Sequence, residues 1–119
     1  MILRTALVLA MASLIVAPSP GQTGGCGATA PEADAADTCL TVGSWECVRA
    51  QQRGELDAGE EVLQACVDEV ADACATAMWP LECQPYPLQR EVDACVEELM
   101  RADRLDTPSS EIPECDFCP

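Results

Sequence analysis

The sequence predicts a small all-α domain of three helices that is held together by disulfide bonds. Apolar residues recur at helical spacing in three segments, and no segment alternates as a strand does. With one Phe, one Tyr and two Trp among 119 residues, the chain has few large side chains for a core. Its nine cysteines supply the cross-links that such a domain needs.

The start of the chain has the features of an export signal, and we expect residues 1–25 to be removed as a signal peptide. Arg4 provides a positive charge, and residues 6–17 form an apolar run that is too short to anchor the chain across a bilayer. The mature protein is therefore expected in an oxidising compartment, where disulfides form and persist.

Residues 23–26, Thr-Gly-Gly-Cys, resemble the end of a bacterial lipoprotein signal peptide, in which a Leu and two small residues precede a Cys that becomes lipidated. Gly25 and Cys26 match that pattern, and Thr23 stands in the place of the Leu. The resemblance, which covers only residues 1–26, implies that Cys26 carries a lipid anchor and attaches the protein to a membrane.

The number of cysteines agrees with lipidation of Cys26. An exported protein with an odd number of cysteines needs another use for one of them, and modification of Cys26 leaves eight. The alternative is ordinary signal-peptidase cleavage at a small-x-small site such as residues 19–21, which leaves Cys26 in a freely secreted product with nine cysteines.

Residues 26–37 are small and polar, and we expect them to form a flexible tether to a domain over residues 38–119. The first helix of that domain is expected over residues 38–53, where Asp37 caps its start and Gly54 stops it. Its inner face carries small and apolar residues: Leu40, Gly43, Cys47 and Ala50. We expect the glycine to weaken this helix.

The second helix is the most regular in the sequence. Asp57 and Glu60 form a capping arrangement at its start, apolar residues recur at helical spacing from Leu63 to Ala77, and the pair at residues 79–80, Trp-Pro, ends it. Because few residues separate it from the first helix, the two are expected to form an antiparallel hairpin.

A loop over residues 79–87, with three Pro and one Cys, is expected to lead into a third helix over residues 88–105. Glu97 and Arg101 in this helix have the spacing of an i,i+4 ion pair. From Asp106 the chain has no helical periodicity, so the sequence predicts an irregular C-terminal tail that contains two cysteines.

The cysteines of the first two helices predict how the hairpin is bridged. Each helix carries two cysteines eight positions apart, and the residue numbers of Cys39 and Cys74 have the same sum as those of Cys47 and Cys66. Residues that face each other in an antiparallel hairpin have this property, so we expect those two bridges. The remaining cysteines then pair among themselves: Cys83, Cys95, Cys115 and Cys118.

A rival pairing joins Cys74 to Cys83 and Cys66 to Cys95, but the two turn centres that it implies coincide neither with each other nor with the centre of the expected loop, so its register is poorer. The arrangement of two helices, each with a cysteine pair and joined by two bridges, resembles the twin-cysteine coiled-coil-helix proteins. In that family the cysteines of a pair lie further apart, and the resemblance implies an architecture only.

Charge and composition exclude several classes of function. Five Arg and 21 acidic residues follow the signal segment, which gives a net charge of −16 and disfavours nucleic acid and anionic lipid as partners. Because the chain has no His, Lys or Asn, it contains no His-based triad, His-containing zinc site, Schiff-base lysine or P-loop.

The remaining chemical motifs favour structural roles. Cys115 and Cys118 have redox-motif spacing, but acidic neighbours raise a thiol pKa, so we expect structural bridges rather than a thiol-disulfide enzyme. The four C-terminal cysteines are expected to form bridges rather than a zinc site. The acidic groups that we considered for calcium or for acid-base catalysis are expected to be solvated: Glu55, Asp57, Glu60, Glu61, Asp68, Glu69 and Asp72.

The sequence therefore predicts a non-enzymatic, exported, lipid-anchored component of the cell envelope or surface, with a structural or protein-interaction role and no cofactor. The alternative is a freely secreted effector or inhibitor, periplasmic or extracellular, that binds a target protein through the loop at residues 79–87 or through the acidic tail. Trp45, Trp79 and Tyr86 are expected to fill the small core rather than to form an exposed recognition patch.

Overall fold

The computed structural model describes residues 30–118, so the export segment and Cys26 lie outside the described residues. Three helices, α1 (Ala35–Gln52), α2 (Glu60–Cys74) and α3 (Gln89–Leu99), are followed by three single 3₁₀ turns: η1 (Ala102–Arg104), η2 (Ser109–Glu111) and η3 (Pro113–Cys115). Residues 30–118 contain no strand, only one isolated bridge between Glu32 and Leu88. The predicted all-α class with three helices is confirmed.

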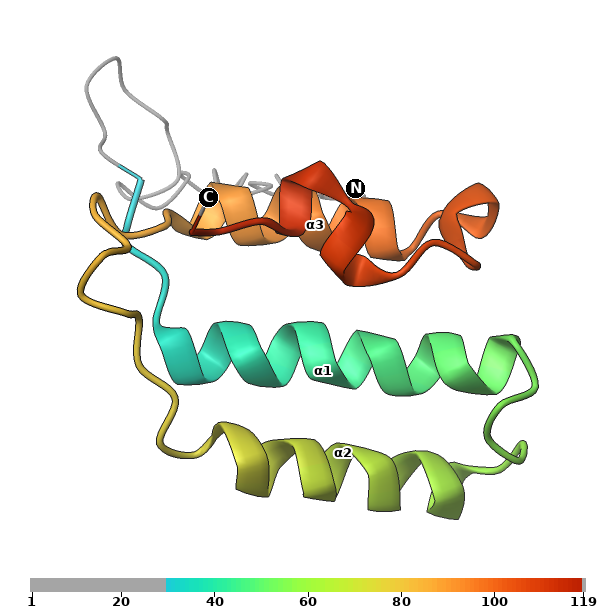
Figure 1. The fold of residues 1–119 in the computed structure, drawn as a ribbon. Helices are drawn as coiled ribbons and strands as arrows, with labels where there is room; N and C mark the ends of the chain where they lie inside the picture. Colours follow the sequence, from blue (N-terminus) through green and yellow to red (C-terminus); the bar gives the residue numbers. More distant parts are fainter. Residues whose placement is uncertain (1–29, 119) are drawn as a thin grey trace, which may run out of the picture.

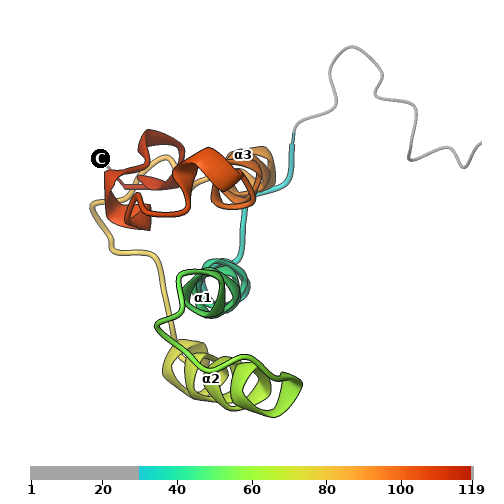
Figure 2. The same ribbon diagram turned by 90° about the vertical axis from the view of Figure 1, so that its right-hand side faces the viewer.

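The helices lie in three layers, with α1 in the middle (Figure 1). The antiparallel helix α2 packs on one side of α1, and α3 with the C-terminal tail packs on the other. The view along the axis of α1 shows the same order (Figure 2). Because α1 packs against both α2 and α3, its contacts join the hairpin to the C-terminal half.

The helix α1 begins earlier than predicted, because Asp34 rather than Asp37 is its N-cap. The Asp34 carboxylate accepts a hydrogen bond from the Asp37 backbone N–H at 2.9 Å, and the Thr38 hydroxyl donates to the Asp34 carbonyl at 2.7 Å. Asp37 then lies in the first turn, where a negative charge is favourable. The predicted stop holds, since Gly54 follows the helix with a positive φ of 76°.

The prediction of a flexible tether through residue 37 is wrong for its described part. The Ala33 N–H donates to the Pro87 carbonyl at 2.8 Å, and the Gln89 N–H donates to the Pro31 carbonyl at 2.9 Å, so residues 31–33 pair with the chain that enters α3. Ala33 is small enough to be buried there, at 4% exposure. The backbone pairing, which composition does not reveal, holds this segment to the domain.

The helix α2 is shorter at both ends than predicted. Its N-cap is Gly59, which makes no side-chain cap, and not Asp57. The turn is held from α1 instead: the Gln51 side-chain amide donates to the carbonyls of Asp57 and Gly59, both at 2.9 Å. At the other end α2 stops at Cys74, because the chain then turns so that Trp79 reaches the start of α1.

Gly43 of α1 sets the distance between the hairpin helices. A Cβ at this position would overlap with the Cγ1 atom of Val70 on α2, so a side chain larger than hydrogen does not fit. The glycine that the sequence marks as a weak point of the helix therefore permits the close approach of the two helices.

The helix α3 ends at Leu99 and not at Leu105, because the following residues turn to place carbonyl groups around Arg49, as described below. The predicted Glu97–Arg101 ion pair is wrong: Arg101 pairs with Glu98 at 3.0 Å and with Asp103 at 2.7 Å. The predicted irregular tail is, in the structure, a chain of short 3₁₀ turns that returns along α3 (Figure 1).

The hydrophobic core lies between α1, α3 and the returning tail. Cys95, Leu99 and Ile112 are its buried centre. Partly buried apolar residues pack around this centre: Val42, Trp45, Cys115 and Phe117. The core is small, and Ile112, Cys115 and Phe117 reach it from a tail with no α-helix, which makes cross-links important for its stability.

Candidate functional site

Four disulfides cross-link the domain: two join α1 to α2, and two hold the tail to the loop before α3 and to α3 itself. The hairpin is bridged by Cys39–Cys74 and Cys47–Cys66, with Cα–Cα distances of 5.6 and 6.0 Å. The tail is held by Cys83–Cys118 and Cys95–Cys115, at 5.1 and 4.7 Å. These are the two hairpin pairs expected from the equal sums, with the four C-terminal cysteines paired among themselves.

The pairing determines what the cysteines are able to do. Cys115 and Cys118 bond to different segments and not to each other, so they act as two separate staples for the tail. The same two bridges occupy all four sulfurs that we considered for zinc. Among residues 30–118, no group of three or more metal-ligating side chains converges.

The acidic residues that we considered for calcium or catalysis are spread over the surface. Glu55 forms an ion pair with Arg53 at 2.9 Å, and this hydrogen bond holds the pKa of the Glu55 carboxyl below its ordinary value. The considered acids of α2 are exposed: Glu60, Glu61, Asp68, Glu69 and Asp72. Glu60, Glu61 and Asp68 border a shallow, open hollow on α2, and none of these carboxylates is buried.

The aromatic residues have different environments. Trp45 packs against the core, as predicted, and Trp79 and Tyr86 are half-buried. The Trp79 indole N–H donates to the Ala33 carbonyl at 2.8 Å, and its ring meets Phe117 edge to face with centroids 6.0 Å apart. Trp79 thus fixes the loop between α2 and α3 against the segment before α1 and against the C-terminal tail.

On either side of Trp79 the loop exposes large apolar side chains. Met78 is 84% exposed and Leu81 is 83% exposed. Burying such a side chain gains about 1.5–3 kcal/mol, so their exposure leaves that stabilisation unused in the isolated domain. Because Trp79 and the Cys83–Cys118 bridge hold the loop on both sides, the exposed residues are displayed on a fixed backbone.

Beside this loop lies an apolar groove with a volume of about 500 Å³. Its walls come from the first half of α1, from the loop and from the tail, and they include Val42, Met78, Pro80 and Phe117. The residues that line it carry no charge. We call the groove together with Met78 and Leu81 the apolar loop surface.

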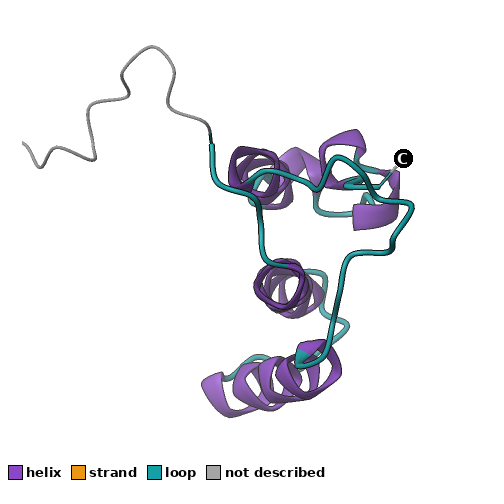
Figure 3. Ribbon diagram, turned by 90° about the vertical axis from the view of Figure 1, so that its left-hand side faces the viewer, coloured by secondary structure: helices purple, strands orange, loops and turns teal. Residues whose placement is uncertain are grey.

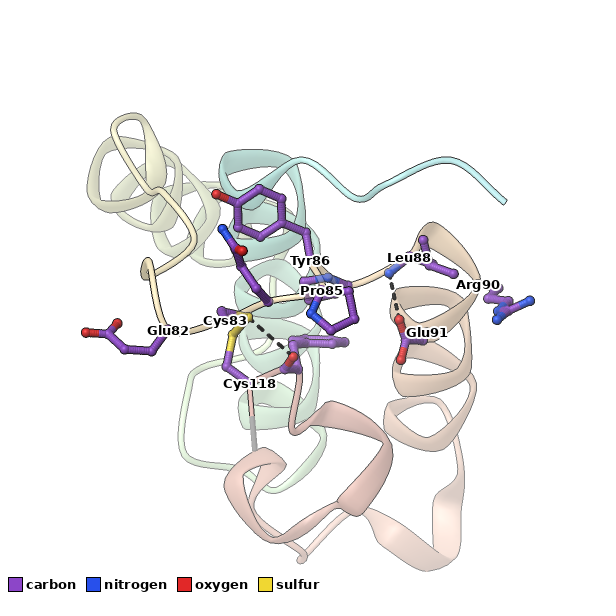
Figure 4. Close-up of a pocket in the computed structure, with 11 residues that line it drawn as sticks. Glu82, Cys83, Pro85, Tyr86, Leu88, Arg90, Glu91 and Cys118 are labelled. Atoms are coloured by element: carbon purple, nitrogen blue, oxygen red, sulfur yellow. Dashed lines mark hydrogen bonds between the residues drawn. A yellow bond between two sulfur atoms is a disulfide. The ribbon is translucent and has the colours of Figure 1, made fainter. Parts of the chain in front are cut away.

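A second hollow of about 410 Å³ adjoins the first and shares Phe117 and Cys118 with it. Its edges carry titratable groups, but Figure 4 shows that Glu82, Tyr86 and Arg90 point in different directions. Glu91 is engaged by the backbone, since its carboxylate accepts from the Leu88 N–H at 2.7 Å. The polar groups of this hollow therefore do not converge on one point.

Sequence reasoning missed the apolar loop surface as a site, although it placed a possible partner at residues 79–87. Met78 lies just outside that range. From the sequence, a Met or Leu beside Trp and Pro is as compatible with a core position as with an exposed one. The signal that was available is the sequence Met-Trp-Pro-Leu between two helices, too apolar for an ordinary surface loop.

Comparisons with known proteins gave no relative. No family model, no curated protein and no solved structure matches this chain. The disulfide-stapled fold and the apolar loop surface are therefore the observations from which its function must be inferred.

Proposed function

We propose that this protein is a non-enzymatic, exported protein-interaction domain, held at a bacterial cell surface or outer membrane by a lipid on Cys26. The fold supports the export step most directly. Four disulfides join the described segments, and such bonds form and persist in an oxidising compartment rather than in the cytosol. A small disulfide-rich protein of this kind fits an extracellular or periplasmic location.

The interaction role rests on the apolar loop surface. Exposed Met78 and Leu81 beside an uncharged groove form the kind of surface that proteins use to bind one another. The groove gathers apolar side chains rather than titratable ones, which favours binding over catalysis. No helix among the described residues is long and apolar enough to cross a membrane.

The lipid anchor is supported by the residues around Cys26 and by the eight cysteines that remain for the four bridges. In the alternative, the same domain is released as a secreted effector or inhibitor. Both forms would use the apolar loop surface, so membrane attachment is what separates them.

The test is to express the full chain in a bacterium that processes lipoproteins and to compare it with its Cys26→Ser variant. We expect the parent protein in the membrane fraction and the variant in the soluble exported fraction. Intact mass of the purified protein, reduced and non-reduced, then reports the cleavage site, the lipid and the number of bridges. A mature N-terminus upstream of Cys26 without lipid would overturn the anchor and favour the secreted form.

A further inference from the structure

We propose that the apolar loop surface binds a polypeptide segment that combines large apolar side chains with Lys or Arg. This inference rests on the proposed interaction role and names the chemistry of the partner. It is carried by three observations: two exposed apolar anchors on a fixed loop, an uncharged groove beside them, and an unneutralised acidic rim.

The anchors are Met78 and Leu81, and the structure prevents them from folding back into the domain. Trp79 between them is turned inward, where its indole bonds to Ala33 and its ring packs on Phe117. Two residues after Leu81, Cys83 is tied to the tail by its disulfide. A backbone that is fixed in this way loses little conformational freedom when a partner covers the loop.

The groove beside the loop accepts apolar side chains from a partner. Its walls are formed by α1, the loop and the tail, and it has about the volume of a small ligand pocket. Met78 forms part of one wall, so a segment that covers Met78 also reaches the groove. A flexible Met at this position adapts to the shape of what it covers.

The rim around the groove is acidic. Asp34, Glu82, Glu114 and Asp116 are exposed and are adjacent in sequence to residues that line the groove or the neighbouring hollow. The ion pairs of the described residues involve other acids: Glu46, Glu55, Glu98 and Asp103. No ion pair of the described residues therefore neutralises these four carboxylates, and Arg90, which lines the neighbouring hollow, pairs with none of them.

The basic residues that take part in these ion pairs lie at the opposite end of α1. Arg49 and Arg53 belong to its C-terminal end, and Arg49 is bonded to the backbone carbonyl of Arg104, which places the C-terminal arginines there too. The groove is at the N-terminal half of α1, next to Ala35 and Thr38. Figure 1 shows the two ends of α1 on opposite sides of the molecule, and Figure 3 views the molecule from the side on which α1 begins.

The acidic rim also disfavours two other occupants of the apolar loop surface. A second copy of this chain would bring one acidic rim against another, and an anionic lipid surface would be repelled in the same way. A segment with apolar side chains flanked by Lys or Arg satisfies both the groove and the rim.

The probe is a short fluorescent peptide with Leu and Trp interspersed with Lys, titrated against the oxidised protein and followed by anisotropy. A peptide of the same length with Glu in place of Lys is its control. We expect the cationic peptide to bind and the acidic peptide not to bind. We expect the double variant Met78→Ser, Leu81→Ser to weaken binding about tenfold or more, and Met100→Ser, at another exposed apolar residue, to leave it unchanged.

A matched pair of charge variants separates local from general attraction. Glu82→Gln with Asp116→Asn removes two charges at the rim, whereas Asp68→Asn with Asp72→Asn removes two charges on α2. We expect a larger loss of affinity from the first pair. Equal losses from the two pairs, or failure of the cationic peptide to bind, would overturn the proposal, and circular dichroism shows that each variant is folded.

Two further measurements test the rejected occupants. Both measurements use the Cys26→Ser variant, which carries no lipid. Sedimentation of this variant alone reports self-association, and its flotation with phosphatidylglycerol vesicles reports lipid binding. Self-association or vesicle binding that is lost in the Met78→Ser, Leu81→Ser variant would assign the surface to that occupant and overturn the peptide. Neither outcome affects the fractionation test of Cys26, so the two proposals fail independently.

Discussion

The Arg49 guanidinium donates a hydrogen bond to the backbone carbonyl of Thr107 at 2.6 Å, although the two residues are 58 positions apart. The same Nη2 atom reaches the carbonyls of Arg104 at 2.6 Å and Leu105 at 3.2 Å, and Nη1 pairs with Glu46. The Arg49 side chain is fully buried, with an exposure of 0%. No pattern in the sequence predicts this contact, which joins the middle helix α1 to the start of the tail.

We therefore predict that Arg49→Met destabilises the domain by about 3 kcal/mol or more, because it leaves three carbonyls without their charged donor. Denaturant unfolding of the oxidised protein measures the loss. Arg90→Met, at an exposed position, is the control and should change stability by no more than about 0.5 kcal/mol. If the two variants were equally stable, the carbonyl contact would have no role in holding the tail.

Gly43→Ala should destabilise the protein, by about 1–3 kcal/mol, because its methyl group meets Val70 of α2. The sign is informative, since the same change in an unobstructed helix interior stabilises by about 1 kcal/mol. Thermal unfolding measures the effect. The double variant Gly43→Ala, Val70→Ala should regain part of the lost stability, and a double variant that loses the sum of the two single effects would contradict the close contact.

The four bridges should hold the fold, since each contributes about 2–4 kcal/mol and the core is small. Excess reductant at physiological temperature should abolish the helical circular dichroism signal. Peptide mapping without reduction should recover Cys39–Cys74 and Cys47–Cys66. A Cys66–Cys95 or Cys74–Cys83 crosslink would contradict the hairpin lattice.

Surface ion pairs should make a small contribution to acid stability. The hydrogen bond from Arg101 holds the pKa of the Asp103 carboxyl below its ordinary value, and Arg53 does the same for Glu55. A carboxyl whose pKa is lower in the folded than in the unfolded protein stabilises the fold at pH values above the unfolded pKa of about 4. That contribution is lost as the pH falls through the folded pKa.

Carbon-detected NMR titration should therefore give the Asp103 carboxyl a midpoint below the ordinary value of an Asp side chain. Arg101→Gln should raise the Asp103 midpoint toward the ordinary value. An unchanged midpoint in that variant would show that Arg101 is not the cause. Because the carboxyls of Asp103 and Glu55 are both exposed, we expect their contribution to the free energy of unfolding to be modest and to decrease with salt.

Features that depend on local periodicity and on numerical register can be predicted from the amino-acid sequence. The three helices follow from apolar spacing, and the hairpin bridges follow from cysteines placed symmetrically about one turn, because a short turn fixes the register of an antiparallel hairpin. The positive φ of Gly54 likewise needs no information beyond the local chain.

Features that depend on contacts between distant segments become visible only in the folded protein. Asp34 replaces Asp37 as the cap because either residue satisfies local rules, and the pairing of residues 31–33 with the entry to α3 selects one of them. The end of α3 depends on carbonyls that turn toward Arg49. Exposure of Met78 depends on Trp79 turning inward. The hydrogen bond that the Trp79 indole donates to the Ala33 carbonyl spans 46 positions, so the local sequence does not predict it.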